Sequence, residues 1–288
     1  SLVYPAQNLL TAVAVGFGVG VNAMISFYLG AQNQEKADKT ATQGMVLGVL
    51  HGALLMVLFL GGMNLFLGMF TKSDTVRALG MEYSNVVFLF SAIVTGGITL
   101  EKIFQAVGRM RATMVSMIAG FVTNIVLDPL LIFGIGPFPK MGVAGAALAT
   151  VIARYIEALI VIIWAHMHRA KNRYLEGAYT GFGIPFAELK AILVKGFPLM
   201  MNEVMWAAGM TTVTQCYSVR GLDVVAGLNI ASTITNLFNI VYLQLGSCIS
   251  IVVGQYLGAG KLEEAKDADN KMIIFSVFCC VIMAALMF

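Results

Sequence analysis

The sequence predicts an all-α polytopic membrane protein, and three observations carry that prediction. Of the 288 residues, 59% are hydrophobic and only 11% are charged, whereas soluble domains carry about 25% charged residues. Apolar runs of about 20 residues, long enough to cross a bilayer as helices, recur along the chain. Residues 8–39 are also similar to residues 236–267, and Tyr-Leu-Gly-Ala at 28–31 is identical at 256–259. We therefore expect about eight transmembrane helices of an inferred twelve, in two six-helix bundles related by a direct repeat.

Eight apolar runs define the expected transmembrane helices. Short polar or charged stretches separate them, and these stretches set the ends of each span to within a few residues. The spans are 3–29, 42–70, 78–107, 112–136, 142–166, 191–218, 229–255 and 271–288.

Glycines mark the first two spans as closely packed helices. Gly16 and Gly20 are four residues apart in the first span, and Gly44 and Gly48 have the same spacing in the second. This spacing places both glycines of a pair on one helix face, where a second backbone can approach closely. The surrounding run is apolar and no strand precedes it, so a nucleotide-binding glycine loop is excluded.

The third span ends in charged residues. Glu101 and Lys102 are adjacent and lie within about two turns of Arg109. Long side chains near a helix end can reach the lipid headgroups. We therefore expect Glu101 and Lys102 to anchor this span at the cytoplasmic surface, with a gating role for Glu101 as the alternative.

The fourth span carries a candidate ion site. Asn124 and Asp128 are four residues apart on one helix face, and Pro129 frees a backbone carbonyl one turn earlier. Ionisable groups inside a bilayer are costly and typically functional. A carboxylate, an amide and a carbonyl suit a proton or a small hard cation such as Na⁺, and Thr150 of the fifth span can add a hydroxyl. The alternative is an aspartate bonded to local backbone beside a proline kink.

Arg154 and Glu157 introduce charge into the middle of the fifth span. They are three residues apart, so they are expected to pair on one helix face. Mutual neutralisation is the simplest reason for both to be there, and a cavity-lining role for Arg154 is the second interpretation. No other basic residue is expected deep in the membrane.

Glu203 makes the sixth span the counterpart of the fourth. It lies about a dozen residues into the span and follows Pro198. As an ionisable group inside the bilayer, Glu203 is a candidate functional residue, and the nearby Met200, Asn202 and Trp206 are candidates to line a substrate cavity. The alternative is a glutamate that snorkels to the interface.

The longest polar loop divides the chain into three parts. Residues 1–166 are expected to form an N-terminal bundle lacking its first helix, and 167–190 a basic, amphipathic linker. Residues 191–288 would then be the first part of the C-terminal bundle. Because the repeat lies on the first and seventh spans, six apart, one further span is expected before Ser1 and about four after Phe288.

Basic residues predict the orientation in the membrane. If loop 30–40 is cytoplasmic, alternation places loops 108–111, 167–190 and 259–271 on the same side. These loops and their immediate flanks hold twelve Lys and Arg residues, against four on the opposite side. The positive-inside rule then predicts that these four loops are cytoplasmic and that the protein is a multi-pass protein of the cell membrane.

The layout and local sequences resemble the multidrug and toxic compound extrusion (MATE) family over essentially the whole chain. The resemblance rests on motifs in both halves. They are the glycine-rich first span ending in Leu29-Gly30-Ala31, Gln105-Ala106-Val107-Gly108-Arg109 before Met114, Asn124 to Pro129 with Ile132-Phe133-Gly134, the run from Met141 to Ala147 with Ala149-Thr150, and Phe197-Pro198 with Glu203.

The resemblance implies a fold, an activity and site residues. It implies twelve helices in two bundles around a cavity that alternates between the two membrane faces. It implies an H⁺- or Na⁺-coupled antiporter that exports cationic, amphipathic drugs or metabolites. In the family, an Asn-x-x-x-Asp pair and a nearby threonine, here Asn124, Asp128 and Thr150, line an ion site. The family also places a coupling acid at the position of Glu203.

Other classes fit the sequence less well. A flippase for lipid-linked saccharide precursors is the closest alternative, but it would favour a strongly basic cavity, and Arg154 alone is expected deep in the chain. No paired-Asp, His-Glu-x-x-His or Ser/His pattern lies at membrane depth, so no enzyme is predicted. The four cysteines lack metal-ligand spacing, and no cofactor is expected beyond the coupling ion. The expected partners are small cationic molecules and the lipid bilayer, with no nucleic acid and a monomeric protein.

Overall fold

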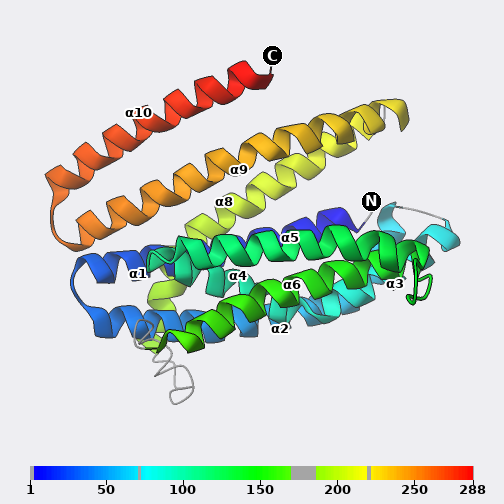
Figure 1. Cartoon of the computed structure of the whole chain (residues 1–288), viewed down its shortest axis with the longest axis horizontal. Helices are drawn as coiled ribbons and strands as arrows, with labels where there is room; N and C mark the ends of the chain where they lie inside the picture. Colours follow the sequence, from blue (N-terminus) through cyan, green and yellow to red (C-terminus); the bar gives the residue numbers. More distant parts are fainter. Residues whose placement is uncertain (1–2, 71–72, 170–185, 219–221, 288) are drawn as a thin grey trace.

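The computed structural model describes residues 3–70, 73–169, 186–218 and 222–287, and within these ranges the chain forms helices and turns without a strand. Most of the predicted linker, 170–185, lies outside the described residues. Figure 1 shows the helices running roughly along one common axis. They are α1 (Tyr4–Gly30), α2 (Gln34–Phe70), α3 (Asp74–Leu89), α4 (Ser91–Ala106), α5 (Met110–Phe133), α6 (Gly142–Met167), α8 (Phe186–Ser218), α9 (Leu222–Gly258) and α10 (Leu262–Met287).

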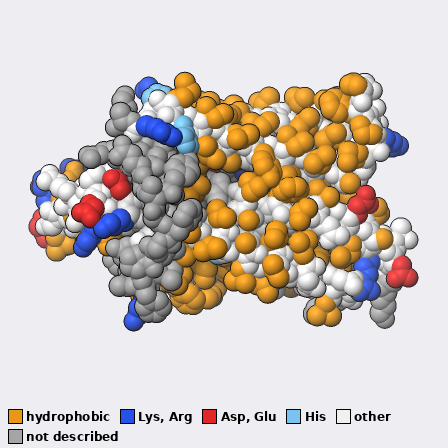
Figure 2. Space-filling model, turned by 90° about the horizontal axis from the view of Figure 1, so that it is seen from below, with side chains coloured by type: hydrophobic (Ala, Val, Ile, Leu, Met, Phe, Trp, Pro, Cys, Tyr) orange, Lys and Arg blue, Asp and Glu red, His pale blue; other side chains and the backbone are white. Residues whose placement is uncertain are grey.

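These helices make a multi-pass membrane protein. Six are long and apolar enough to cross a membrane, and the bent pair α3 and α4 makes a seventh candidate span. Helix α8, whose apolar stretch contains Asn202 and Glu203, is not among these candidate spans of the described residues. Figure 2 shows hydrophobic side chains over the middle of one face, with charged side chains gathered towards its two ends.

The third predicted span is two helices rather than one. Helices α3 and α4 are bent by 50° where they meet at Phe90. At the bend the hydroxyl of Ser91 donates a hydrogen bond to the carbonyl of Phe88, at 2.8 Å. A hydroxyl that binds a helix carbonyl in this way competes with the backbone ladder and favours a kink.

Two charged stretches predicted as loops are helical. Helix α2 begins at Gln34 and buries Ala37, while the exposed Lys39 pairs with Glu35 at 2.8 Å. Helix α10 begins at Leu262 in the same way. Each stretch is amphipathic, so a small alanine face packs inward while charged residues one turn apart pair on the outside.

Helix α1 joins the two parts of the fold. It contacts α2 and α4 of the N-terminal part and α8 and α9 of the C-terminal part. The predicted glycine face carries this packing, because Gly16 lies against the backbone of Met200 and Gly20 against Gly196. The second predicted pair also packs closely, with Gly48 facing Thr99 of α4.

The two Tyr-Leu-Gly-Ala copies meet in space. Gly30, at the end of α1, lies against the backbone of Gln255, and Gly258, at the end of α9, lies against the backbone of Phe27. A shift of 228 residues converts one contact into the other, so the contact has approximate two-fold symmetry. Both turns lie at the left end of the molecule in Figure 1. We call this contact the Gly30/Gly258 seam.

We expect Gly20→Ala to lower the stability of the protein. An added Cβ would lie 2.6 Å from the Cα of Gly196, a backbone atom that cannot move aside freely. Overpacking of this kind costs about 1–3 kcal/mol. A Cβ added at Gly62 in α2 would have no neighbouring described atom within 4 Å, so Gly62→Ala is the matched control. Thermal unfolding in detergent should show a lower Tm for Gly20→Ala only, and equal Tm values would contradict this packing.

Candidate functional site

Asp128 lies on α5 directly before Pro129, which is inside the helix. Its side chain is half-buried, and its Oδ1 atom is inaccessible to solvent and has no hydrogen-bond partner among the described atoms. Asn124 is one turn earlier on the same helix and is also half-buried. A buried carboxylate oxygen without a partner is costly, so this atom is suited to an added proton or cation.

Side chains from three other helices surround this position. The hydroxyl of Tyr83, on α3, donates a hydrogen bond to Oε1 of Gln7 on α1, at 3.3 Å. The same hydroxyl interacts with Thr150 on α6 and lies near enough to Asp128 for an electrostatic interaction. The structure therefore brings Asp128 and Thr150 together around Tyr83. We call Gln7, Tyr83, Asn124, Asp128 and Thr150 the Asp128 cluster.

Tyr83 and Gln7 were not predicted from the sequence. The only available signal for Tyr83 is the polar run Glu82-Tyr83-Ser84-Asn85 within an otherwise apolar region. Gln7 directly precedes the first copy of the repeat and carries no pattern of its own. Their part in the cluster depends on the packing of α3 against α6, which brings Tyr83 near Thr150, and on the bond from Tyr83 to Gln7 of α1.

A pocket of about 650 Å³ adjoins the Asp128 cluster, within the range of small-molecule sites. Gln7 and Tyr83 supply polar groups to its wall, and apolar or small residues supply the rest. The other lining residues are Val3, Tyr4, Val76, Leu79, Gly80, Ile132, Gly142, Val143 and Ala146. The cluster is therefore connected to a space that a small ligand can occupy.

Glu203 lies apart from the Asp128 cluster, on α8. It is half-buried and lies near enough to Lys102 of α4 for an electrostatic interaction. Met200, one turn earlier, has its backbone against Gly16, whereas Asn202 and Trp206 are exposed, the latter by 50%. The four predicted residues of α8 therefore surround one short stretch of helix but do not share one face.

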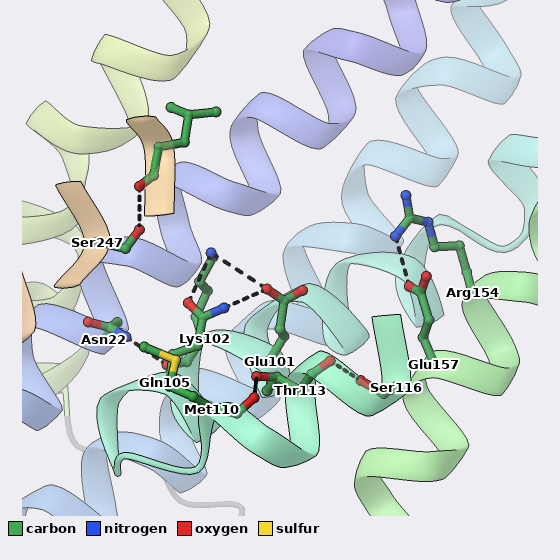
Figure 3. A network of polar contacts seen from close by, with 11 residues as sticks. Asn22, Glu101, Lys102, Gln105, Met110, Thr113, Ser116, Arg154, Glu157 and Ser247 are labelled. Carbon is green, nitrogen blue, oxygen red and sulfur yellow. Dashed lines mark hydrogen bonds and ion pairs between the residues drawn. The ribbon is translucent and has the colours of Figure 1, made fainter. Parts of the chain in front are cut away.

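Arg154 and Glu157 form the predicted ion pair, with 2.8 Å between Nη1 and Oε2 (Figure 3). Gly120 of α5 leaves the space that the Glu157 side chain occupies. The small cavity beside the pair, about 20 Å³, is lined by residues of α4, α5 and α6 and is large enough for about one water molecule. The structure does not bring Arg154 together with the predicted cavity residues of α8.

The prediction that Lys102 anchors at the membrane surface is wrong. Lys102 is only 7% exposed, and its ammonium lies 3.1 Å from Oε1 of Gln105 and 3.7 Å from Oε1 of Glu101. Gln105 also donates to Glu101 at 2.7 Å, which closes a polar network (Figure 3). The physical reason is packing, since α4 lies against α1, where Gly18 leaves room for the Lys102 stem.

These features define a multi-pass helical membrane protein with a buried lysine held inside the bundle. The sequence model of the MatE family matches residues 1–130 and 198–288. The chain belongs to the MatE family.

Curated relatives agree with this assignment. The chain is 31% identical over 206 residues to the multidrug export protein MepA of Staphylococcus aureus, covering 71% of this chain and 44% of MepA. It is 24% identical over 275 residues to a probable multidrug resistance protein NorM of Neisseria meningitidis serogroup B, covering 93% and 58%. An FAD transporter of Shewanella oneidensis is 23% identical over 272 residues, covering 93% and 59%. The chain thus spans less than two thirds of the length of these relatives.

Solved structures show the same fold. A crystal structure of MATE in the straight conformation superposes with a TM-score of 0.85 at 25% identity, covering 99% of this chain and 62% of that one. An outward-facing multidrug resistance MATE transporter of the MOP superfamily gives 0.78 at 25% identity, covering 97% and 62%. The helix arrangement of Figure 1 is therefore that of MATE transporters.

Proposed function

We propose that the complete protein is an H⁺- or Na⁺-coupled antiporter that exports cationic, amphipathic compounds by alternating access. Family membership and the relatives described as multidrug export proteins support this class of substrate. The observation that carries the proposal is the Oδ1 atom of Asp128, which has no hydrogen-bond partner in the described part of the chain and lies in a cluster of oxygen-bearing side chains. The protein would act as a monomer in the cell membrane, with loops 30–40, 108–111, 167–190 and 259–271 facing the cytoplasm.

The Asp128 cluster offers the chemistry that such coupling needs. Carboxylate, amide and hydroxyl oxygens are the ligands of hard cations, and Asp128, Asn124 and Thr150 supply one of each. A proton on Asp128 would serve the same purpose, because it also removes the charge of a half-buried carboxylate. Tyr83 of α3 interacts electrostatically with Asp128 and donates a hydrogen bond to Gln7 of α1, so a change of charge on Asp128 acts on both helices.

The Glu203 region offers the chemistry for an organic cation. Glu203 supplies negative charge, and Trp206, one turn later, supplies an aromatic face for a cation–π contact. Met200 adds a flexible apolar side chain, which adapts to ligands of different shape. Asn202 supplies a hydrogen-bonding amide on the exposed side of α8.

Export of an anionic metabolite is the second candidate function, and one observation favours it. The expectation that Arg154 is the only deep basic residue is wrong, because Lys102 is buried inside the bundle, whereas Arg154 is exposed on α6. A buried ammonium could bind the phosphates of a flavin nucleotide or of a lipid-linked saccharide precursor. The similarity to an FAD transporter points the same way. The bonds from Lys102 to Glu101 and Gln105 argue for the cationic substrate, since the ammonium is already neutralised.

One experiment separates these functions. The complete protein is reconstituted in liposomes loaded with ethidium, and dye release is followed under an H⁺ gradient or a Na⁺ gradient. Release that depends on one gradient supports the cation antiporter and identifies its ion. No release under either gradient, together with uptake of FAD or of a lipid-linked saccharide, would replace it with the second candidate.

We expect Glu203→Gln to abolish gradient-driven ethidium release without preventing membrane insertion. The amide keeps the shape of the side chain but removes the charge that a cation needs. Glu263→Gln, at an exposed position of α10, is the control for loss of one carboxylate. The yield of protein in the membrane fraction checks insertion. Ethidium release at the wild-type rate in Glu203→Gln would show that this carboxylate takes no part in transport.

A further inference from the structure

Helices α5 and α6 pack against each other along their length, and two contacts show which of their residues lie side by side. A Cβ added at Gly120 of α5 would meet the side chain of Glu157, and a Cβ added at Gly145 of α6 would meet the backbone of Leu131. Between these contacts α5 advances by eleven residues while α6 goes back by twelve. The two helices are therefore antiparallel, and the start of α5 lies beside the end of α6.

Basic and histidine side chains gather at this end of the pair. Nine residues beyond the contact of Gly120 with Glu157, Arg111 of α5 is level with His166 of α6. Two residues further, Arg109 is level with His168. Figure 2 shows Lys, Arg and His side chains lying together at one end of the face. We call the group the Arg109 patch, which consists of Arg109, Arg111, His166, His168 and Arg169.

The arginines of the Arg109 patch carry positive charge that the described residues do not pair. Arg109 is half-buried, and Arg111 and Arg169 are exposed. None of the three forms an ion pair with another described residue. No Asp or Glu occurs in residues 102–127 or 158–169, the parts of the chain that lead into and out of the patch. The patch is therefore suited to an anion that comes from outside these two helices.

An aromatic side chain places the Arg109 patch at the depth of the lipid headgroups. Trp164 is half-buried and stacks on His168, with 4.4 Å between the ring centroids. It also contacts Phe104 of α4 edge-on, at 5.6 Å. Tryptophan is enriched in membrane proteins where the hydrocarbon core meets the headgroups. The patch begins two residues beyond Trp164, so its charges lie among the headgroups.

Apolar side chains continue from the Arg109 patch towards the middle of the membrane. Met114 of α5 is level with Ile163 of α6, and Ile118 is level with Leu159, and all four are exposed. Such side chains are as apolar as lipid tails. Guanidinium groups bind phosphate oxygens through paired hydrogen bonds. A charged end followed by an apolar surface therefore matches the two parts of a phospholipid, which a free phosphate does not have.

We propose that the Arg109 patch binds the phosphate of an anionic phospholipid whose acyl chains lie along α5 and α6. Arg109 and Arg111 of α5 and Arg169 of α6 hold one headgroup, so the lipid joins the ends of two helices. A zwitterionic lipid has the same phosphate but no net charge, so it binds more weakly. The site uses none of the residues proposed to bind the coupling ion or the exported cation, so it stands apart from the proposed function.

Quenching of Trp164 fluorescence by brominated lipids tests this site, because bromine quenches a tryptophan at short range. The complete protein, with its other tryptophans replaced by phenylalanine, is reconstituted in phosphatidylcholine vesicles that contain brominated phosphatidylglycerol or brominated phosphatidylcholine. With the patch intact, phosphatidylglycerol should be preferred at Trp164 at least about fivefold, the effect of one arginine near the headgroups. Arg109→Gln/Arg111→Gln should bring this ratio close to one, and Arg109→Lys/Arg111→Lys should retain the preference. Equal quenching by the two lipids with the patch intact, or an undiminished preference in the glutamine variant, would overturn the proposal.

Two controls separate the Arg109 patch from overall charge and from a site for free phosphate. Lys261→Gln/Lys266→Gln also removes two positive charges, but these lysines pair with Glu264 and Glu263 on α10. The lipid preference should survive in this variant, and its loss would assign the effect to overall charge. In detergent, phosphatidylglycerol should raise the Tm of the wild type but not of the glutamine variant of the patch. An equal rise with inorganic phosphate at the same concentration would make the patch a free-phosphate site and overturn the lipid assignment.

Discussion

Replacement of Asp128 by asparagine is expected to reduce gradient-driven ethidium release at least about tenfold, a loss of about 1.4 kcal/mol or more in coupling. Asparagine has nearly the same shape but cannot carry a proton or neutralise a cation. In the wild type, Oδ1 of Asp128 is buried without a partner among the described atoms. Uptake of a proton or a cation therefore stabilises the buried carboxylate. The amide of asparagine gains no such stabilisation, so ion uptake no longer drives release.

The Asp128→Asn experiment requires two controls. Asp74→Asn, at an exposed position in the first turn of α3, tests whether loss of any single carboxylate slows release. Tyr83→Phe tests the cluster itself, because it removes only the hydroxyl that contacts Gln7 and Thr150. We expect Asp74→Asn to resemble the wild type and Tyr83→Phe to fall between. Wild-type release in Asp128→Asn, with normal insertion, would remove the Asp128 cluster from the coupling mechanism.

Valine at Gly258 is expected to open the Gly30/Gly258 seam and to stop export. Any side chain at this position would meet the backbone of Phe27 and Ala31, and backbone atoms cannot turn aside as a side chain can. Gly30→Val should have the same effect through Gln255. Gly246→Val is the matched control, because Gly246 lies in the same helix α9 and a Cβ added there would have no neighbouring described atom within 4 Å.

Thiol labelling measures the opening of the seam directly. Ser26 is fully buried and lies against Gly254 of α9, so Ser26→Cys in a background without other cysteines should react slowly with a water-soluble thiol reagent. Adding Gly258→Val should speed labelling and adding Gly246→Val should not. Equal labelling rates in all three proteins would mean that the seam does not shield this position.

The helices themselves could be predicted from the sequence, but their contacts could not. Apolar runs indicated each span because membrane helices need about 20 apolar residues in sequence, although one of these spans, 78–107, is two helices. The same runs do not show which side of a helix faces the protein, because residues that face lipid and residues that face protein are equally apolar. For that reason the bend at Phe90, the burial of Lys102 and the approach of Tyr83 to Asp128 became visible only in three dimensions. Each depends on a neighbour that is distant in sequence.

Local spacing predicted the parts of the site that lie on one helix. Arg154 and Glu157 are three residues apart and do pair. The prediction places Lys102 at the membrane surface because it lies near the end of a span. Gln105, one turn after Glu101 on the same helix face, is the sequence signal of a buried polar network. The division at 167–190 and the ion-coupling roles of Asp128 and Glu203 remain predictions.

The bent span of α3 and α4 connects the Asp128 cluster to the polar network around Lys102. Helix α3 carries Tyr83 of the Asp128 cluster, and α4 carries Lys102, twelve residues beyond the bend. At 1.5 Å per residue, Lys102 stands about 18 Å from this pivot. A change of about 10° in the bend would swing a rigid α4 so that Lys102 moves by about 3 Å relative to α3, and Glu101 moves with it because both lie on α4. The kinked span is thus a mechanical lever, in which a small rotation beside the Asp128 cluster becomes a displacement of the buried Lys102 network against α1.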